Sequence, residues 1–153
     1  MYVPCAVFRR TPLERADERL AWDRDDQYFF AAGACHVLAY AFLSCHNGFG
    51  AMGLWPTGAE NPGHVYASNG VWAFDHSGWT PEPELLLTSR AAEPRPDYQA
   101  RPIDLALDEL CARYWMRGRR EFAHDPWQRA HDYISRFPDP RSQHPGDQKS
   151  KAS

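Results

Sequence analysis

The sequence lacks the features that mark membrane proteins and nucleic-acid-binding proteins. No apolar run approaches the roughly 18 residues of a membrane-spanning helix, and the longest, residues 28–44, is interrupted by Gly33 and His36. Lysine occurs only at Lys149 and Lys151, and the net charge of −3 provides no basic surplus to neutralise a phosphate backbone. We therefore expect neither a membrane nor a nucleic-acid partner.

No export signal is visible in the sequence, and its cysteines are few. Its first residues, Met1 to Pro4, contain no basic segment followed by an apolar one. A small secreted domain usually has more closely spaced cysteines than this chain, whose four are Cys5, Cys35, Cys45 and Cys111. We expect reduced thiols and a cytoplasmic location, with export by a signal-independent route left open.

The composition is that of a folded domain. The chain has 153 residues, of which 43 % are hydrophobic and 14 % aromatic, so it can bury one core without disulfides or metal sites to stabilise it. Residues 138–153 are rich in Pro, Ser, Gln, Lys and Asp, which favours disorder. We predict a single domain over residues 1–137 and a disordered tail over 138–153.

The pattern of residues predicts an α+β fold. A helix is expected over residues 34–44 after Gly33, and a hairpin over 64–68 and 71–75 around the turn pair Asn69-Gly70. The remaining predictions are a strand at 2–8, a helix at 13–22, a loop at 46–63 with a strand near 52–55, a helix starting at 80–82, a Pro-rich connector at 93–102, and helices at 103–122 and from 125 to 137.

The hairpin would bring a histidine and an aspartate together. If Asn69 and Gly70 form a two-residue turn, Ser68 pairs with Val71, and the same register places His64 opposite Asp75. Opposed side chains share a face with Cβ atoms about 4.5–5.5 Å apart. A carboxylate at that distance fixes the tautomer of an imidazole and favours its protonated form. The pair would thus supply a general base and the group that orients it.

Cys35 is the candidate nucleophile. It follows Gly33-Ala34 and falls in the first turn of the expected helix. Free backbone N–H groups and the positive end of the helix dipole stabilise a thiolate at that position. The N–H of Cys35 itself could bind the oxyanion of a tetrahedral intermediate. The small sheet would then pack against the Cys35 helix, which we expect to cover the His64 face, while the C-terminal helices cover the opposite face of Trp72.

With the order Cys35, His64, Asp75, residues 27–80 resemble the papain-like and transglutaminase-like cysteine hydrolases and acyl transferases. The resemblance rests on Gly33-Ala34-Cys35-His36 opening a helix, Gly63-His64-Val65 opening a strand, and Trp72 to Asp75 followed by Gly78. It implies a papain-like fold and a catalytic triad in which Cys35 is the thiol nucleophile, His64 the general base and acid, and Asp75 the orienting residue.

The resemblance also suggests a substrate class and accessory residues. Gln27 is a candidate for the oxyanion hole, and His36 and Trp79 are candidates for the substrate site. Because the stretch from Cys35 to His64 is short, it favours a small amidase, deamidase or acyl-transfer site over a protease with a deep cleft. Substrates would be a protein, a peptide or a small amide, and the chemistry requires neither a metal nor an organic cofactor.

Two alternatives use the same residues. Cys35-His36 and Cys45-His46 suggest a zinc site, but ten residues of helix rise about 15 Å, whereas zinc ligands lie about 2.0–2.3 Å from the metal. The zinc interpretation therefore requires the helix to end before Leu43, and the same distance argues against a Cys35–Cys45 disulfide. The second alternative is a non-catalytic binding protein on the same scaffold.

Overall fold

A computed structural model of the chain describes residues 1–92 and 98–142. Its five strands form one open antiparallel sheet in the order β4-β3-β2-β1-β5. The strands are β1 (Gly50–Pro56), β2 (His64–Ser68), β3 (Trp72–Asp75), β4 (Gly78–Pro81) and β5 (Tyr98–Ile103). With its helices the described chain is of the α+β class, which confirms the class predicted from the sequence.

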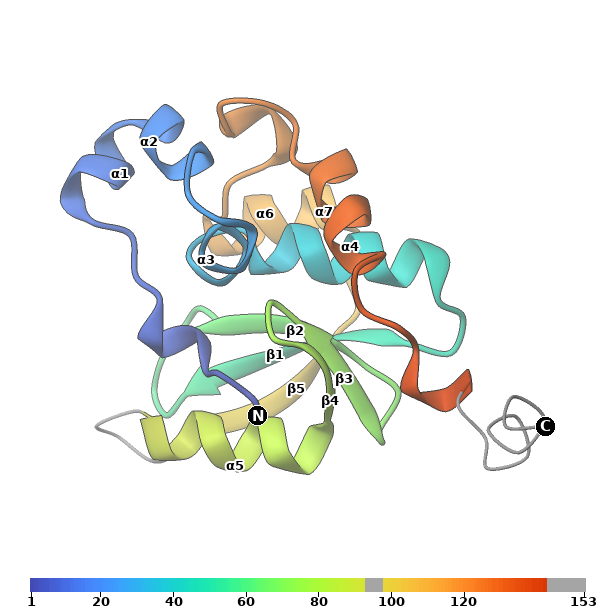
Figure 1. The fold of residues 1–153 in the computed structure, drawn as a ribbon. Helices are drawn as coiled ribbons and strands as arrows, with labels where there is room; N and C mark the ends of the chain where they lie inside the picture. Colours follow the sequence, from blue (N-terminus) through green and yellow to red (C-terminus); the bar gives the residue numbers. More distant parts are fainter. Residues whose placement is uncertain (93–97, 143–153) are drawn as a thin grey trace, which may run out of the picture.

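The α-helices lie on both sides of this sheet. They are α1 (Pro12–Ala16), α2 (Glu18–Trp22), α3 (Asp26–Ala31), α4 (Cys35–Cys45), α5 (Glu82–Ala92), α6 (Leu107–Tyr114) and α7 (Trp127–Ile134), with short 3₁₀ turns at Cys5–Val7, Arg119–Glu121 and Pro140–Ser142. Figure 1 shows α3, α4, α6 and α7 on one side of the sheet and α5 with the N-terminal segment on the other. In the described residues no helix is both long and apolar enough to cross a bilayer.

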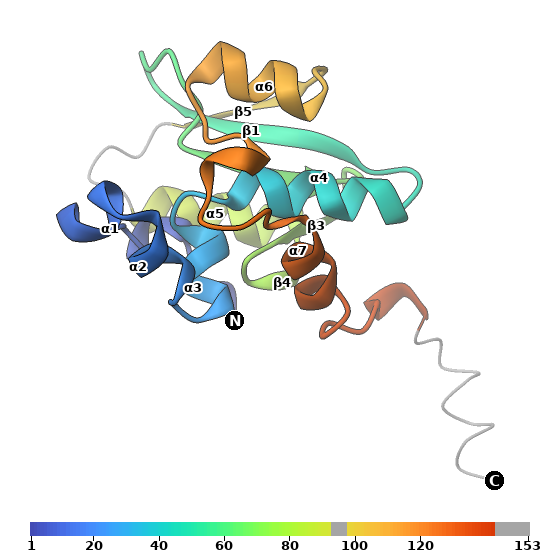
Figure 2. The ribbon, with the colours of Figure 1, turned by 90° about the horizontal axis from the view of Figure 1, so that it is seen from above.

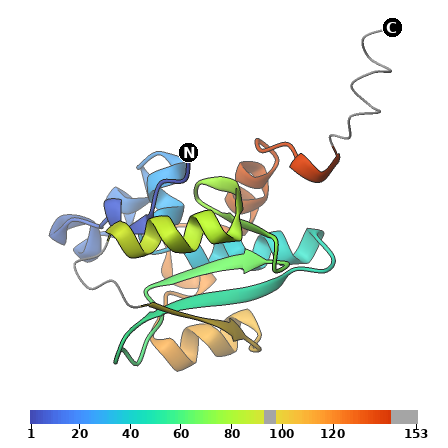
Figure 3. The same ribbon diagram turned by 90° about the horizontal axis from the view of Figure 1, so that it is seen from below.

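The two faces of the sheet bury separate cores. Ala67 and Phe74 pack against α4 and α7, together with Phe42 and Tyr133. The opposite face carries Tyr66, Ala73 and Leu54, which pack against Leu85 of α5 and against Tyr2. Figure 2 views the molecule from the α4 side, and Figure 3 shows α5 lying across the other face. Every residue of β2 is consequently buried.

The faces are covered differently from the sequence prediction. The Cys35 helix and α7 share the Phe74 face, whereas Tyr66, which lies two residues from His64 on the same strand, packs against α5 and the N-terminal segment. The expectation that the Cys35 helix covers the His64 face is therefore wrong. Cys35 is the first residue of α4, and it interacts with His64 from the end of that helix rather than from its packed side.

The hairpin forms, but with a register different from the predicted one. Ser68 pairs with Ala73 and Ala67 with Phe74, instead of Ser68 with Val71. The side chain of Asn69 accepts hydrogen bonds from the backbone N–H groups of Val71 and Trp72, at 2.9 and 2.7 Å. That local bonding keeps Val71 out of the ladder and lengthens the turn.

Continued along the strands, the observed register places Asp75 opposite Tyr66. The predicted direct pairing of His64 with Asp75 is therefore wrong. Because the shift amounts to two residues, each side chain keeps its face of the sheet. His64 and Asp75 are diagonal neighbours, and long side chains can still meet across that arrangement.

Several local predictions need correction. The expected strand at 2–8 is a short 3₁₀ turn with extended flanks, and the helix at 13–22 is divided at Asp17, which caps α2 by accepting from Arg19 N. The second half of the expected connector is β5, which pairs with β1. The expected helix at 103–122 ends at Tyr114, where Trp115 adopts a left-handed backbone with φ 58°.

The helix at 34–44 is confirmed as α4, which begins and ends one residue later. It continues without a break to Cys45, so the zinc alternative lacks the early helix end that it requires. The prediction of a single domain over residues 1–137 stays a prediction. Residues 143–153 lie outside the described part of the chain, so the prediction of a disordered tail is untested there.

Candidate functional site

His64 and Asp75 form a buried hydrogen-bonded pair. The Nε2 atom of His64 lies 2.8 Å from Oδ2 of Asp75, and each residue is only 2 % exposed. An ionised carboxylate only accepts, so Nε2 carries the proton in this pair. The structure therefore brings together the two residues that the sequence places on neighbouring strands, and it leaves Nδ1 as the nitrogen available for proton transfer.

Asp75 is fixed by further donors that the sequence analysis missed. The hydroxyl of Tyr2 donates to Oδ2 at 2.6 Å, and the backbone N–H of Ser77 donates to Oδ1 at 2.8 Å. Burial raises the pKa of Asp75, but interactions with His76 and His64 and the hydrogen bond from Tyr2 lower it below its ordinary value. Asp75 is thus ionised at neutral pH although it is fully enclosed.

His76 completes the surroundings of this carboxylate. Its Nε2 donates to the carbonyl of Val3 at 2.6 Å, and its Nδ1 lies 3.6 Å from Oδ2 of Asp75. Burial lowers the pKa of His76 below its usual value, which favours a neutral ring. The hydroxyl of Tyr133 on α7 donates to the backbone carbonyl of His76. These contacts connect the N-terminal segment and α7 to the end of β3.

Cys35 is an acidic thiol. Burial by itself raises the pKa of Cys35, but hydrogen-bonding interactions with His36 and His64, and the charges of both rings, lower it to about 5. Cys35 as a whole residue is of intermediate exposure. At neutral pH the thiolate of this residue predominates.

The imidazole of His64 is the cationic partner. Burial lowers the pKa of His64, but interactions with Cys5, Tyr2, Asp75 and Cys35 raise it well above its usual value. Its buried Nδ1 makes no hydrogen bond of standard geometry with any of the described residues. Cys35 and His64 thus interact electrostatically without an aligned bond, which is common before substrate binding tightens a catalytic site.

The start of α4 offers hydrogen-bond donors beside the thiol. Ala34 at the N-cap position has no side chain that could accept from the first-turn N–H groups. The preceding Gly33 has φ +108°, a backbone conformation that side chains rarely adopt. This uncapped end is the positive end of the helix dipole, so it stabilises a thiolate and can bind an oxyanion.

His36, which the sequence analysis names as a candidate for the substrate site, is a buried residue that interacts with Cys35. It is 2 % exposed, and its Nε2 donates to the carbonyl of Arg117 at 2.6 Å. Burial lowers the pKa of His36, whereas interactions with Cys111 and Cys35 raise it to about 9. His36 therefore contributes positive charge to the Cys35 thiolate from the buried side.

The other two accessory candidates do not join the thiol. Trp79 packs near the far end of α4, with ring centroids 5.1 Å from Phe42 and 5.5 Å from His46. Seven helical residues, about 10 Å of rise, separate Phe42 from Cys35, so Trp79 does not line a site at Cys35. Gln27 lies in the first turn of α3 and is not among the residues that line the cavity described below.

Asp75 and two neighbouring buried side chains, His64 and His76, could together hold a cation. One ligand atom from each of His64, Asp75 and His76 lies within 4.8 Å of the others. Hydrogen bonds already account for the pair of His64 and Asp75 and for Nε2 of His76. The geometry therefore fits a hydrogen-bonded network, and chelator treatment tests the alternative below.

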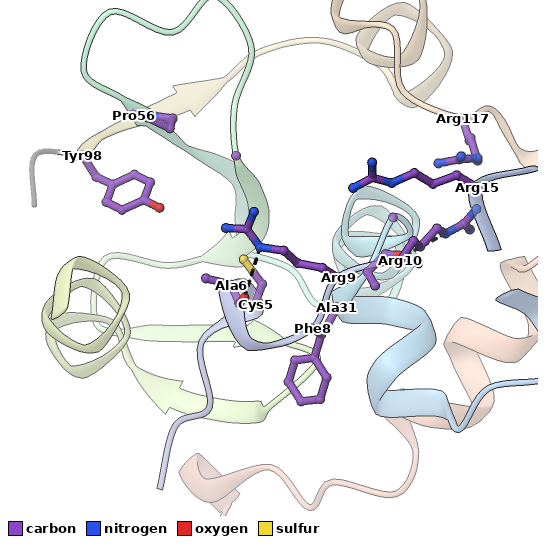
Figure 4. A pocket seen from close by; sticks show the side chains of 13 residues that line it. Cys5, Ala6, Phe8, Arg9, Arg10, Arg15, Ala31, Pro56, Tyr98 and Arg117 are labelled. Atoms are coloured by element: carbon purple, nitrogen blue, oxygen red, sulfur yellow. Dashed lines mark hydrogen bonds between the residues drawn. The ribbon is translucent and has the colours of Figure 1, made fainter. Parts of the chain in front are cut away.

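A cavity of about 440 Å³ lies against the chain segments that lead into Cys35 and His64, although neither of these two residues is part of its wall (Figure 4). Gly33, two residues before Cys35, and Gly63, immediately before His64, lie in its wall. Cys5, which interacts with His64, lies there as well. A pocket of this size can enclose part of a small ligand, and its wall includes residues one and two positions before the reactive pair in the sequence.

Sequence reasoning missed the N-terminal contribution to this site. Tyr2 and Val3 contact Asp75 and His76, which lie more than seventy residues further along the sequence. The hydrophobic pattern of residues 2–8 indicated only a strand, and no local signal reports a contact of such range. The Arg9-Arg10 pair, which also lines the cavity, was a visible but unused signal.

Comparison with known proteins gives no further assignment. No family model, curated protein or solved structure matches the chain.

Proposed function

We propose that the protein is a thiol-dependent hydrolase or acyl transferase that acts on an amide or acyl substrate through Cys35, His64 and Asp75. One observation carries the proposal: a buried imidazole bonded to a carboxylate interacts with a thiol whose pKa is lowered to about 5. Buried structural cysteines ordinarily have a raised pKa and are inert. Strong perturbation by specific partners beside a cavity is typical of a functional site.

The proposed first half of the reaction uses the groups described above. The Cys35 thiolate attacks the substrate carbonyl carbon, and the N–H groups at the start of α4 stabilise the resulting oxyanion. Protonated His64 gives the proton on Nδ1 to the leaving amine or alcohol as the carbon–heteroatom bond breaks. Asp75 holds the Nε2–H of His64 throughout and keeps Nδ1 directed to the reaction. The product is a thioester on Cys35.

The second half uses the same groups in reverse. Neutral His64 takes a proton from the incoming nucleophile, which attacks the thioester carbonyl and releases Cys35 as a thiolate. Water as acceptor gives hydrolysis, and an amine gives acyl transfer. The order of residues and the partners of His64 support a distant relationship to papain-like and transglutaminase-like enzymes, and a peptidase, amidase or deamidase activity follows from that proposal.

Transfer of an acyl group to Cys35 tests the proposal directly. p-Nitrophenyl acetate provides a small activated ester, and mass spectrometry of the peptide that contains Cys35 detects the acetyl thioester. We expect rapid acetylation of Cys35, followed by turnover as the thioester hydrolyses. His64→Ala should reduce turnover about 100-fold or more, because proton transfer by a positioned base contributes at least that factor.

Matched variants separate this mechanism from its alternatives. Cys35→Ser should abolish the adduct, while Cys45→Ser, at an exposed thiol near the other end of α4, should behave as wild type. EDTA should leave turnover unchanged, and a loss would instead favour a metal held by His64, Asp75 and His76. Acetylation of Cys35 no faster than that of free cysteine would favour a non-catalytic binding protein.

A further inference from the structure

The cavity beside the thiol is strongly basic. Arg9, Arg10, Arg15 and Arg117 all contribute to its wall, whereas none of its lining residues is acidic. The whole chain carries a net charge of −3, so this concentration of positive charge is local and opposite in sign to the protein average. An anion entering the cavity would meet a positive potential on several sides.

One described carboxylate neutralises part of this charge. Both oxygens of Glu18 accept from Nη1 of Arg10, at 2.9 and 2.8 Å, and Nε of Arg117 donates to Oε2 of Glu18 at 2.8 Å. A single negative charge is thus shared by two guanidinium groups. Within the described residues, no carboxylate pairs with Arg15.

Arg10 is built into the cavity wall. Its side chain is only 5 % exposed, and its Nε donates to the carbonyl of Ala32 at 3.0 Å. The guanidinium covers Gly33, where an added Cβ would lie 2.9 Å from Nε. Its Nη2 atom is buried with no hydrogen-bond partner in the described part of the chain. Leaving a charged donor unsatisfied is costly, and an acceptor bound at this wall would offset that cost.

The arginines that line the cavity come from the N-terminal segment, from α1 and from the chain that follows α6. Figure 4 shows Arg9 and Arg15 extending in the same direction across the cavity, toward the side where Pro56 and Tyr98 lie. Gly33 leads into α4 and the thiol, so Arg10 binds at the wall next to the reactive group. A substrate anchored there could extend toward Cys35, which follows Gly33 by two residues.

We propose that this arginine-lined cavity binds an anionic group, a carboxylate or a phosphate, on the acyl substrate of Cys35. Planar guanidinium groups bind either oxyanion through paired N–H donors. The inference rests on the proposed thiol chemistry and adds the substrate class, because a neutral amide would leave the positive charge of the cavity unused. The enzyme is therefore selective for acyl compounds that carry negative charge near the scissile bond.

Two alkylating reagents of similar size test the proposal. Iodoacetate is anionic and iodoacetamide is neutral, and both transfer a carbon to the Cys35 sulfur as the C–S bond forms and iodide leaves. We expect the rate with iodoacetate to saturate with concentration, because the anion binds before it reacts. The ratio of the iodoacetate rate to the iodoacetamide rate should exceed the ratio measured for free cysteine by at least tenfold.

Matched arginine variants assign the effect to the cavity. Arg15→Gln removes an exposed lining charge and should lower the iodoacetate rate about fivefold, the effect of a partly exposed ion pair, with the iodoacetamide rate unchanged. Arg19→Gln is the control, since Arg19 is also exposed on a neighbouring helix but does not line the cavity. It should leave both rates unchanged.

Competition distinguishes the two kinds of anion. Succinate and inorganic phosphate are added separately at constant ionic strength, and labelling by iodoacetamide is followed. Protection by succinate indicates a carboxylate substrate and protection by phosphate a phosphorylated one, and Arg15→Gln should weaken either. If iodoacetamide reacts rapidly but neither anion protects and iodoacetate shows no preference, the anion site is refuted while the thiol chemistry stands. If iodoacetamide labels Cys35 no faster than it labels free cysteine, the proposed function itself fails.

Discussion

The acidity of Cys35 leads to a selective labelling experiment within one molecule. Cys35 and Cys45 lie at opposite ends of α4 and can be distinguished by the peptides that contain them. Cys45 is the more exposed of the two, but burial raises its pKa above the ordinary value of 9.0. Accessibility alone therefore favours Cys45, while thiolate content favours Cys35, and the two effects give opposite outcomes.

The expected size of the effect follows from the two pKa values. At about pH 6 a thiol with a pKa of about 5 is mostly thiolate, whereas one at the ordinary 9.0 is about 0.1 % thiolate, a difference of roughly 900-fold. The nucleophilicity of a thiolate falls as its pKa falls, with a Brønsted coefficient near 0.45, and this reduces the advantage of Cys35 by a factor of about 60. The net expectation is labelling of Cys35 about 15-fold faster than of Cys45.

The assay is brief treatment with iodoacetamide over a range of pH, followed by quantification of both peptides. The Cys35 rate should rise through a midpoint near pH 5 and then level off, whereas the Cys45 rate should continue to rise beyond pH 8. Replacing His64 by Ala should move the Cys35 midpoint to higher pH, and His36 would retain part of the shift. Preferential labelling of Cys45 at pH 6 would refute the assignment of Cys35 as an activated thiol.

Three further predictions concern the groups around this site. Tyr2→Phe removes a buried hydrogen bond to an ionised carboxylate and should lower the free energy of unfolding by about 1.5–3 kcal/mol; urea denaturation measures it, and an unchanged midpoint would contradict the bond. Gly78→Ala, at φ +82° with an added Cβ 2.6 Å from the Phe137 ring, should cost about 1–3 kcal/mol in the same assay. Because the pKa of Asp75 is lowered in the folded state, its stabilisation is present above its unfolded value and is lost as the pH falls through the folded value. Thermal unfolding between pH 5 and 2 should therefore decline less steeply in Asp75→Asn than in wild type, and identical slopes would exclude this contribution.

The local features of the site could be read from the sequence. Helix-forming residues after Gly33 predicted α4 and put Cys35 in its first turn. The alternation of residues around Asn69-Gly70 predicted two strands with His64 and Asp75 on one face. That result tolerated an error in register, because the observed shift of two residues preserves the face of each side chain.

The long-range features could not be read in the same way. The exact turn depends on hydrogen bonds that one side chain, that of Asn69, accepts from backbone N–H groups. Which layer covers each face of the sheet depends on how α4, α5 and α7 compete for apolar surface, and local periodicity does not determine that outcome. The contacts of Tyr2 with Asp75, and of Arg117 with Glu18, join segments whose separation in the chain conceals their proximity.

The hydrogen bond from Tyr2 to Asp75 makes the chemistry depend on completion of the fold. The acidity of Cys35 depends on His36 and His64, the charge of His64 depends in part on Asp75, and that carboxylate accepts a hydrogen bond from Tyr2. A partly folded chain thus carries an ordinary thiol that reacts slowly with electrophiles. Reactivity of Cys35 at acidic pH consequently reports that the N-terminal segment, the hairpin and α4 have all assembled.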